Sequence, residues 1–287
     1  MEIMEPLKDI VIVYHDNCMD GFGAAWSAWK KYGDNASYIP AKYSDTPISD
    51  ISGKELYIVD FSYPKDVLIE MEKKTKRLVV LDHHITAHEA IISVKEHVYG
   101  EDKSGAYLAW EFFHPNTKVP RLIEYISDSD TWTNKMPQWE EVNSYIYREN
   151  KEKFSFDSFE NSYKELETEE GYKKAIEIGS VLRESHMARV EKYADKAELV
   201  SFEGYQIYTT SSPSEVRGEL GHILAEKTGT FSLIFWYEKG IWKCSLRSVK
   251  DFDVTVIAKK YKGGGHKNAA AFTVPTDFPL PFAKKVT

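Results

Sequence analysis

Short apolar runs separated by helical segments make up roughly the first 135 residues of the chain. The runs cover residues 10–14, 56–59 and 78–81, and they are rich in valine and isoleucine with no polar alternation. Such runs are typical of parallel strands that helices cover on both faces. Ser104 is a good N-cap for a helix that Pro115 would end. The pattern predicts a doubly wound α/β domain with a mainly parallel sheet.

The pattern changes after Leu199. Residues 205–209 predict a strand, 214–227 a helix, 231–237 and 241–246 a hairpin around Lys239-Gly240, 254–261 a helix, and 271–274 a closing strand. Between the two regions, apolar residues from Ile176 to Tyr193 recur at helical spacing with charges between them. We therefore predict an α/β domain with a helical extension over 1–175, a connecting helix over 176–198, and a smaller α+β domain over 199–287.

Composition and charge narrow the class of protein. With 287 residues and 42% hydrophobic content, the chain can bury cores for two domains. The sequence has only two cysteines, so we expect no disulfides. It shows no basic region followed by an apolar segment at its N-terminus, and no apolar stretch long enough to cross a membrane. We therefore expect a cytoplasmic protein without a membrane span. The net charge of −8 disfavours a broad basic surface for long nucleic acids.

Each apolar run of the N-terminal domain leads into acidic or imidazole side chains. The first leads into His15 and Asp20, the second into Asp60, and the third into Asp82-His83-His84. Because the carboxyl ends of parallel strands line one crevice, these groups are expected to converge. Carboxylates suit hard divalent cations and imidazole suits transition metals, so the pattern predicts a metal site. A further acid, Asp128 or Asp130, follows in 125–132.

In this order, His15 with Asp20-Gly21, Asp60, Asp82-His83-His84 and the Asp128 region resemble the four N-terminal motifs of the DHH phosphoesterases. Near the C-terminus, Gly263-Gly264-Gly265-His266, preceded by Arg247-Ser248, resembles the glycine-rich signature of the accessory DHHA1 domain. The resemblance spans nearly the whole chain. Residues 15–26 look most like the branch of oligoribonuclease B, the nanoRNases.

The resemblance implies two divalent metal ions. One would be held by Asp20, Asp60, His83 and Asp128, and the other by His15 and Asp60 with water or a third group. Many members carry an aspartate where this chain has Cys18, so Cys18 and Asp16 are alternative ligands. Asp130 is a further alternative, or a cap for the next helix. Carboxylate-rich ligation favours Mn²⁺, with Mg²⁺ or Co²⁺ as alternatives.

The remaining motif residues are predicted to act on the substrate. His84 would hydrogen-bond the phosphate or the leaving oxygen, and Asp82 would orient a histidine. Backbone N–H groups of successive glycines can form an anion nest, and an arginine fork suits a terminal phosphate. The predicted clamp, on the opposite wall of an interdomain active-site cleft, comprises Arg247, Ser248, Gly263, Gly264, Gly265 and His266.

These features together predict a metal-dependent phosphodiesterase that uses a dinuclear metal-activated water. Its substrates would be short RNA or DNA oligonucleotides or dinucleotides (nanoRNA), released as 5′ mononucleotides. The alternatives are a cyclic or linear dinucleotide phosphodiesterase, a 3′-phosphoadenosine 5′-phosphate phosphatase and, outside the enzymes, a metal-dependent nucleotide-binding sensor. Substrate length, direction of attack and a homodimer are left open.

Overall fold

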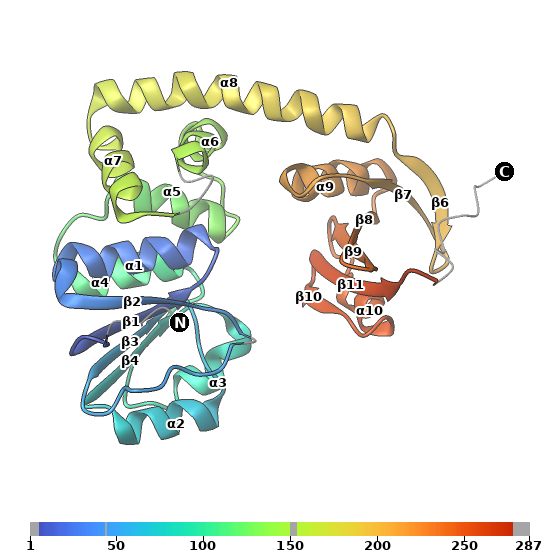
Figure 1. Cartoon of the computed structure of the whole chain (residues 1–287). Helices are drawn as coiled ribbons and strands as arrows, with labels where there is room; N and C mark the ends of the chain where they lie inside the picture. The colour runs from blue at the N-terminus through green and yellow to red at the C-terminus, as the bar shows by residue number, and fades with distance from the viewer. Residues whose placement is uncertain (1–5, 44, 150–153, 278–287) are drawn as a thin grey trace. The chain divides into compact units, whose positions relative to one another are not determined.

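The chain forms two compact units, Met1–Leu182 and Arg183–Thr287, in a computed structural model that describes residues 6–43, 45–149 and 154–277 (Figure 1). The first unit is α/β with a parallel sheet, and the second is a smaller α+β unit, as predicted. Most of the predicted connecting helix lies within α8 (Glu169–Ala194). The predicted domain boundaries and the cleft between the domains stay predictions.

The sheet of the first unit has five parallel strands in the order β2-β1-β3-β4-β5. The three predicted apolar runs form its central strands β1, β3 and β4, and two less apolar strands form its edges. The bounds are β1 (Ile10–His15), β2 (Ala36–Ala41), β3 (Glu55–Val59), β4 (Arg77–Asp82) and β5 (Glu96–Tyr99).

Helices cover both faces of this sheet, which explains the absence of polar alternation in its central strands. Ile12 packs into the core under α1 (Met19–Tyr32), α4 (Gly105–Phe113) and α5 (Arg121–Asp130). Val11 and Val13 pack into the opposite core, under α2 (Lys65–Lys74) and α3 (His88–Ile91). Each such fully buried aliphatic side chain contributes about 1.5 to 3 kcal/mol.

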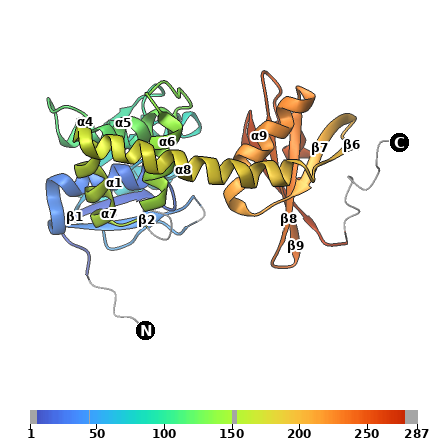
Figure 2. The same ribbon diagram turned by 90° about the horizontal axis from the view of Figure 1, so that it is seen from above.

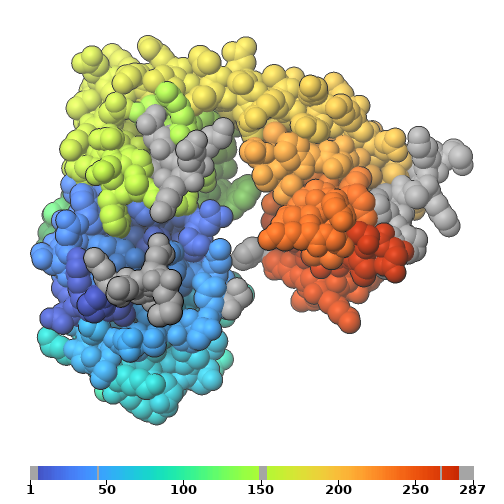
Figure 3. Space-filling model, viewed as in Figure 1, coloured from blue at the N-terminus to red at the C-terminus, as the bar shows by residue number. Residues whose placement is uncertain are grey.

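A helical extension completes the first unit. Helix α7 (Phe156–Leu166) packs on α1 through aromatic rings. Helix α6 (Trp139–Glu149) lies beside α5 and α7, and α6 and the start of α8 contribute to the same hydrophobic core. The centroid of the Phe22 ring lies 4.8 Å from that of Phe159 and 5.1 Å from that of Phe156. In Figure 3 the blue surface of the N-terminal segment adjoins the yellow-green surface of this extension. The expected cap is present, because the Ser104 hydroxyl accepts the Tyr107 N–H at the start of α4.

The second unit has a six-stranded mixed sheet in the order β10-β11-β9-β8-β7-β6, in which only β7 and β8 pair in parallel. Lys239 and Gly240 turn the predicted hairpin with φ of +50° and +85°. Helix α9 packs against β7 and β8 (Figure 2). The bounds are β6 (Glu198–Phe202), β7 (Tyr205–Ser211), α9 (Arg217–Thr228), β8 (Phe231–Glu238), β9 (Ile241–Ser248), α10 (Thr255–Lys260), β10 (Gly264–His266) and β11 (Ala269–Pro275).

Candidate metal centre

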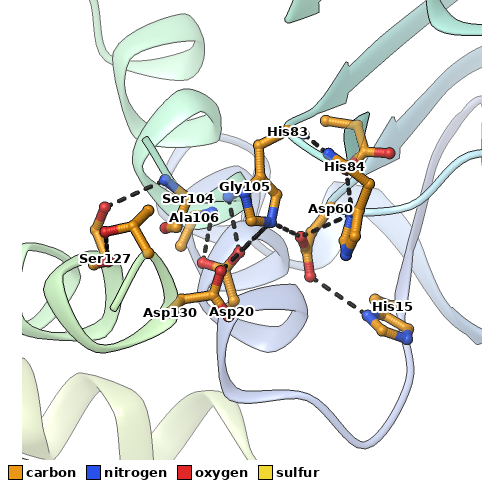
Figure 4. Close-up of polar contacts among 12 residues, drawn as sticks. His15, Asp20, Asp60, His83, His84, Ser104, Gly105, Ala106, Ser127 and Asp130 are labelled. Atoms are coloured by element: carbon orange, nitrogen blue, oxygen red, sulfur yellow. Dashed lines mark hydrogen bonds and ion pairs between the residues drawn. The ribbon is translucent and has the colours of Figure 1, made fainter. Parts of the chain in front are cut away.

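Most of the predicted ligands gather at the carboxyl edge of the sheet. There the chain adds β2 on one side of β1, and β3 and β4 on the other. His15 ends β1, Asp60 follows β3 and Asp82 ends β4, and these three strands are neighbours. The helix after β1 covers one face and the helix after β3 covers the other, and sheets with this topology bind ligands at the carboxyl ends of such strands. The close-up in Figure 4 shows the side chains from these ends pointing toward one another.

One imidazole nitrogen lies at the centre of the cluster. His83 Nε2 is 3.3 Å from Asp60 Oδ1, 3.4 Å from Asp130 Oδ2 and 3.7 Å from Asp20 Oδ2 (Figure 4). Ligands that each lie about 2.1 Å from one ion are about 3.0 Å apart at octahedral angles and about 3.4 Å apart at tetrahedral angles. The separations from His83 Nε2 are close to these values, so each of the three carboxylates is placed to share a divalent cation with His83. Asp20, His83 and Asp130 also offer donor atoms that lie within 4.8 Å of one another.

Asp60 has two buried carboxylate oxygens that are left without a hydrogen bond. Its side chain is 1% exposed, and neither oxygen has a hydrogen-bond partner among the described residues. His15 Nδ1, which is also buried without a hydrogen bond, lies 3.6 Å from Asp60 Oδ2. Buried carboxylates are normally paired or bound to metal. One oxygen facing His83 and the other facing His15 is the arrangement expected of a carboxylate that bridges two ions.

The backbone conformation at Asp60 and a close contact with α4 fix the position of its carboxylate. Asp60 has a φ of +51°, and its N–H donates to the carbonyl of Leu81 on the neighbouring strand. A methyl group at Gly105 would come within 2.4 Å of Asp60 Cβ. Glycine at this position therefore lets the start of α4 approach the carboxylate closely.

The same helix start fixes Asp20. The N–H of Gly105 donates to Asp20 Oδ2 at 2.7 Å, and the N–H of Ala106 donates to Oδ1 at 2.9 Å. These are unpaired N–H groups of the first turn of α4, where negative charge is favoured. Burial, Asp60 and Asp130 nevertheless raise the pKa of Asp20 well above its usual range. A cation among the three carboxylates would relieve that repulsion.

The charges of the cluster favour an anionic Asp60 and cationic histidines. Burial opposes ionisation of Asp60, but His15, His83 and His84 outweigh it and lower its pKa to about 2. Burial also opposes protonation of His83, and Asp60 and Asp130 outweigh it and raise its pKa. The carboxylates around His83 thus favour positive charge at this position, of the kind that a bound metal would supply.

Asp82 contacts His84, and both offer donor atoms within 4.8 Å of those of Asp60 and His83. Asp82 Oδ1 lies 2.7 Å from His84 Nδ1 and also accepts the backbone N–H of His83 at 2.8 Å. Burial lowers the pKa of His84, but the bond to Asp82 outweighs it and raises the value to about 9. Asp82 therefore holds the ring of His84 and keeps it protonated at neutral pH.

Two predicted ligands lie outside the cluster, and the sequence preference for Asp128 over Asp130 is corrected. Asp128 Oδ1 accepts the N–H of Lys135 and Oδ2 accepts that of Met136, so both oxygens are used in closing a loop. Asp130 is the last residue of α5, and α6 begins only at Trp139, so Asp130 does not cap that helix. Asp16 pairs instead with Lys42 at 3.2 Å.

Cys18 lies beside His15 and Asp60, which would hold a second ion. Its sulfur, His15 and Asp60 offer donor atoms that lie within 4.8 Å of one another. Burial, together with the charge of Asp60, raises the pKa of the thiol to about 12. The side chain is therefore a neutral thiol in the metal-free protein, and a thiol is a poor ligand for a hard cation.

Sequence reasoning identified Ser104 only as a helix cap and missed Gly105 and Ala106, whose backbone binds Asp20. It also missed a cavity of about 220 Å³ beside the cluster, to which α6 contributes Asn143 and Tyr147. A serine followed by two small residues just after the last strand is a usable signal for a helix start near the site.

Arg247 offers a guanidinium without an acidic partner. Its Nη1 donates to Ser245 Oγ and to the carbonyl of Leu246, both at 2.9 Å, and no carboxylate pairs with it in the described ranges. Burial lowers its pKa. Its side chain packs on Gly221, where a methyl group would come within 2.7 Å of Arg247 Cγ. A half-buried arginine of this kind suits an anion.

The rest of the predicted clamp differs from expectation. The Ser248 hydroxyl is buried and donates to the carbonyl of Phe252 at 2.7 Å, so it holds a loop. The glycines form no nest, because Gly263 N–H donates to the Ala258 carbonyl and 264–266 pair with β11 as an edge strand. Gly264 has open space where its Cβ would be. The side chain of His266 lies outside the described residues.

Comparisons with known proteins give one domain match and a likeness in fold. Residues 205–285 match the DHHA1 domain, so the second unit carries a DHHA1 domain. The whole chain shares its fold with the pGpG-specific phosphodiesterase PggH from Vibrio cholerae, with a TM-score of 0.55, 13% identity, and coverage of 93% of this chain and 94% of that one. An exopolyphosphatase-related protein from Bacteroides fragilis gives a TM-score of 0.50 at 14% identity, covering 92% and 86%.

The chain also has a relative in sequence. It is 31% identical over 285 residues to uncharacterized protein R106 of Acanthamoeba polyphaga mimivirus, and the match covers 91% of this chain but 66% of that protein's length. The domain match thus identifies a DHHA1 domain in residues 205–285, and the likeness in fold extends over most of the rest of the chain. None of the helices in the described ranges combines the length and hydrophobicity that a membrane span requires.

Proposed function

We propose that this chain is a divalent-metal-dependent phosphodiesterase that hydrolyses short oligonucleotides to 5′ mononucleotides, as in the nanoRNase branch. The observation that carries the proposal is the cluster itself. Three carboxylates surround one histidine nitrogen at 3.3 to 3.7 Å, and the most central carboxylate, that of Asp60, has two buried oxygens without hydrogen bonds. Such a donor set suits Mn²⁺, with Mg²⁺ or Co²⁺ as alternatives.

One ion would be held by Asp20, Asp60, His83 and Asp130, and a second by His15 and Asp60 with Cys18 nearby. When bound, such ions offset the charge of a phosphodiester and make water a stronger acid. The α4 N-terminus would hold Asp20 in place through the N–H groups of Gly105 and Ala106. A two-metal site requires ligands that are held in position before the ions bind.

His84 would act on the phosphate or on the leaving oxygen. Its Nδ1 is bound to Asp82 at 2.7 Å, which fixes the ring and leaves Nε2 as the remaining donor. Its raised pKa keeps it protonated at neutral pH, so it can donate a hydrogen bond to an oxygen that gains charge. Arg247, for which the described ranges contain no carboxylate partner, would bind a phosphate of a substrate.

The substrate is proposed to be short. A net charge of −8 suits two or three phosphates better than a long strand. The fold shared with a pGpG-specific phosphodiesterase makes a linear dinucleotide the nearest alternative within the class. The neutral Cys18 thiol beside the second ion supports one alternative outside the enzymes, a metal-dependent nucleotide-binding sensor.

The test is Mn²⁺-dependent release of mononucleotides from end-labelled RNA. Dinucleotide, tetranucleotide and long strands are compared with cyclic dinucleotides and 3′-phosphoadenosine 5′-phosphate, using wild type, Asp130→Asn and the exposed control Asp9→Asn. We expect turnover that is fastest on the shortest strands and is lost in Asp130→Asn alone. Tight binding without turnover of any substrate would select the sensor, and preferred cleavage of long strands would reject the proposal.

A further inference from the structure

The cavity beside the metal cluster has features that neither the metals nor the phosphate explain. It has a volume of about 220 Å³ and lies within the first unit. Asp20 and Asp130, two of the proposed ligands, line it together with Cys18. The rest of its wall comes from α5, the loop after it and α6, and comprises Ile126, Ser129, Trp132, Asn143 and Tyr147, with Met19 from α1.

Two of the wall residues are large aromatic side chains that face solvent. Trp132 is 78% exposed and Tyr147 is 55% exposed. Within the described ranges neither ring contacts another aromatic ring. Exposed, unstacked aromatic rings at a cavity are suited to stack on a planar ligand, since apolar surface of this size is normally covered.

A buried amide supplies the second, independent observation. Asn143 lies one helical turn before Tyr147 on α6, so both project from the same face. Its side chain is 7% exposed, and its Nδ2 has no hydrogen-bond partner among the described residues. An unpartnered buried N–H group is unfavourable by about 1 to 3 kcal/mol, so its presence in the cavity wall points to a ligand that accepts a hydrogen bond.

The loop that carries Trp132 is held firmly for a surface segment. Asp128 accepts the N–H groups of Lys135 and Met136 at 2.9 and 3.0 Å, and its Oδ1 accepts the Thr133 hydroxyl at 2.6 Å. The N–H of Trp132 donates to the carbonyl of Ser129 at 3.2 Å. The backbone that carries the exposed indole is thus held in place by these hydrogen bonds.

We propose that this cavity binds a nucleobase of the substrate, with Trp132 and Tyr147 as stacking surfaces and Asn143 as a hydrogen-bond donor to the base edge. A nucleobase is planar, stacks on aromatic rings and carries acceptor atoms on its edge, and so matches the three groups together. The inference rests on the proposed function, because the cavity shares Asp20 and Asp130 with the metal cluster. It makes the enzyme selective for phosphodiesters of nucleosides over those of sugars without a base.

The test measures binding, so that it does not depend on turnover. Calorimetry with Mn²⁺ compares AMP and UMP with ribose 5-phosphate, which has the same phosphate and sugar without the base. We expect wild type to bind the nucleotides about 10-fold more tightly or better, the range that base stacking on one ring provides. In Trp132→Ala/Tyr147→Ala this advantage falls to less than about 3-fold, while ribose 5-phosphate binds as before.

Two further variants separate stacking from hydrogen bonding and from general surface effects. Asn143→Leu replaces a buried amide by an apolar group of similar size, so it keeps the melting temperature and loses part of the base advantage. Tyr237→Ala removes a 58% exposed aromatic side chain from the second unit and keeps the full advantage.

An unchanged base advantage in Trp132→Ala/Tyr147→Ala, or equal affinity of wild type for AMP and ribose 5-phosphate, overturns the nucleobase site. Failure of the proposed function gives a different result. In that case no phosphodiester is cleaved, although the nucleotides still bind more tightly than ribose 5-phosphate and the double variant still abolishes the difference.

Discussion

Asp60→Asn tests the central element of the candidate metal centre. The substitution keeps the size and shape of a side chain that is 1% exposed, and removes its charge. Because the carboxylate lies 3.3 Å from His83 Nε2 and 3.6 Å from His15 Nδ1, the variant loses both contacts as charged interactions. An amide oxygen could still reach one ion, but an amide does not bridge two cations as a carboxylate does.

The expected loss of stability follows from the pKa of Asp60. A value of about 2, against about 3.9 for a free aspartate, favours the folded protein by roughly 2 to 3 kcal/mol. Since the folded-state pKa is lowered, this stability is present above pH of about 4 and is lost as pH falls through about 2. At neutral pH the metal-free variant should therefore melt about 5 to 10 °C below wild type, and the difference should vanish in strong acid.

Metal addition and turnover give two further readouts. Mn²⁺ at about 100 times its dissociation constant stabilises a single-site protein by about 2.7 kcal/mol, or roughly 5 to 10 °C for a unit of this size. We expect that rise in wild type and in Asp9→Asn, and little of it in Asp60→Asn. Loss of the bridging charge should lower kcat by about 1,000-fold or more, which corresponds to about 4 kcal/mol.

The assay is a thermal melt with and without Mn²⁺, paired with release of mononucleotides from a labelled dinucleotide. The variant must first show a cooperative melt, so that a loss of activity is not a loss of fold. A variant that keeps both the Mn²⁺-induced rise and the rate of wild type would refute the bridging role. A variant that loses the rise but keeps the rate would show that the bound metal is not used in the reaction.

The remaining predictions concern the groups around Asp60. The pKa of His84 is raised to about 9, and this shift stabilises the metal-free protein by up to about 3 kcal/mol. The stabilisation is complete below pH of about 6.5 and absent above about 9. In urea unfolding, His84→Gln should therefore be less stable than wild type at low pH, and this difference should disappear as pH rises. Gly105→Ala should destabilise the protein by about 1 to 3 kcal/mol by chemical denaturation and weaken Mn²⁺ binding, since its methyl group would lie 2.4 Å from Asp60 Cβ; unchanged metal affinity by calorimetry would contradict this. Arg247→Ala should raise KM by about 10-fold with little change in kcat, whereas a collapse of kcat alone would argue against a distant phosphate contact. Cys18→Asp should tighten binding of a second Mn²⁺, measured by metal titration, and Cys18→Ser should not.

The sheet and much of the site follow from the sequence because both depend on local pattern. The runs at 10–14, 56–59 and 78–81 are buried on both faces, so the chain must supply apolar residues at every position. Their polar ends converge because parallel strands share one carboxyl edge. The edge strands β2 and β5 were not predicted, since an edge strand is partly exposed and lacks that continuous apolar signal.

The choice between Asp128 and Asp130 could not be made from the sequence. Both lie in the last turn of α5. Residues two apart on a helix point about 200° apart, so only one of them can face the cluster. Which one faces it depends on how α5 packs on α1 and α4, a tertiary property. The glycine run at 263–265 was misread for a related reason, because its pairing with Ala269–Ala271 is a contact between strands that no local pattern reveals.

The two aspartates of α5 divide their roles between the metal centre and the cavity beside it. Asp130 lies 3.4 Å from His83 Nε2, among the proposed ligands, whereas Asp128 closes the loop that presents Trp132. A shift of α5 would therefore move a proposed metal ligand and the proposed base-stacking ring together. Because the same short helix fixes both, the distance between the reacting phosphate and the nucleobase would be set by one rigid element, as an enzyme selective for short nucleotides requires.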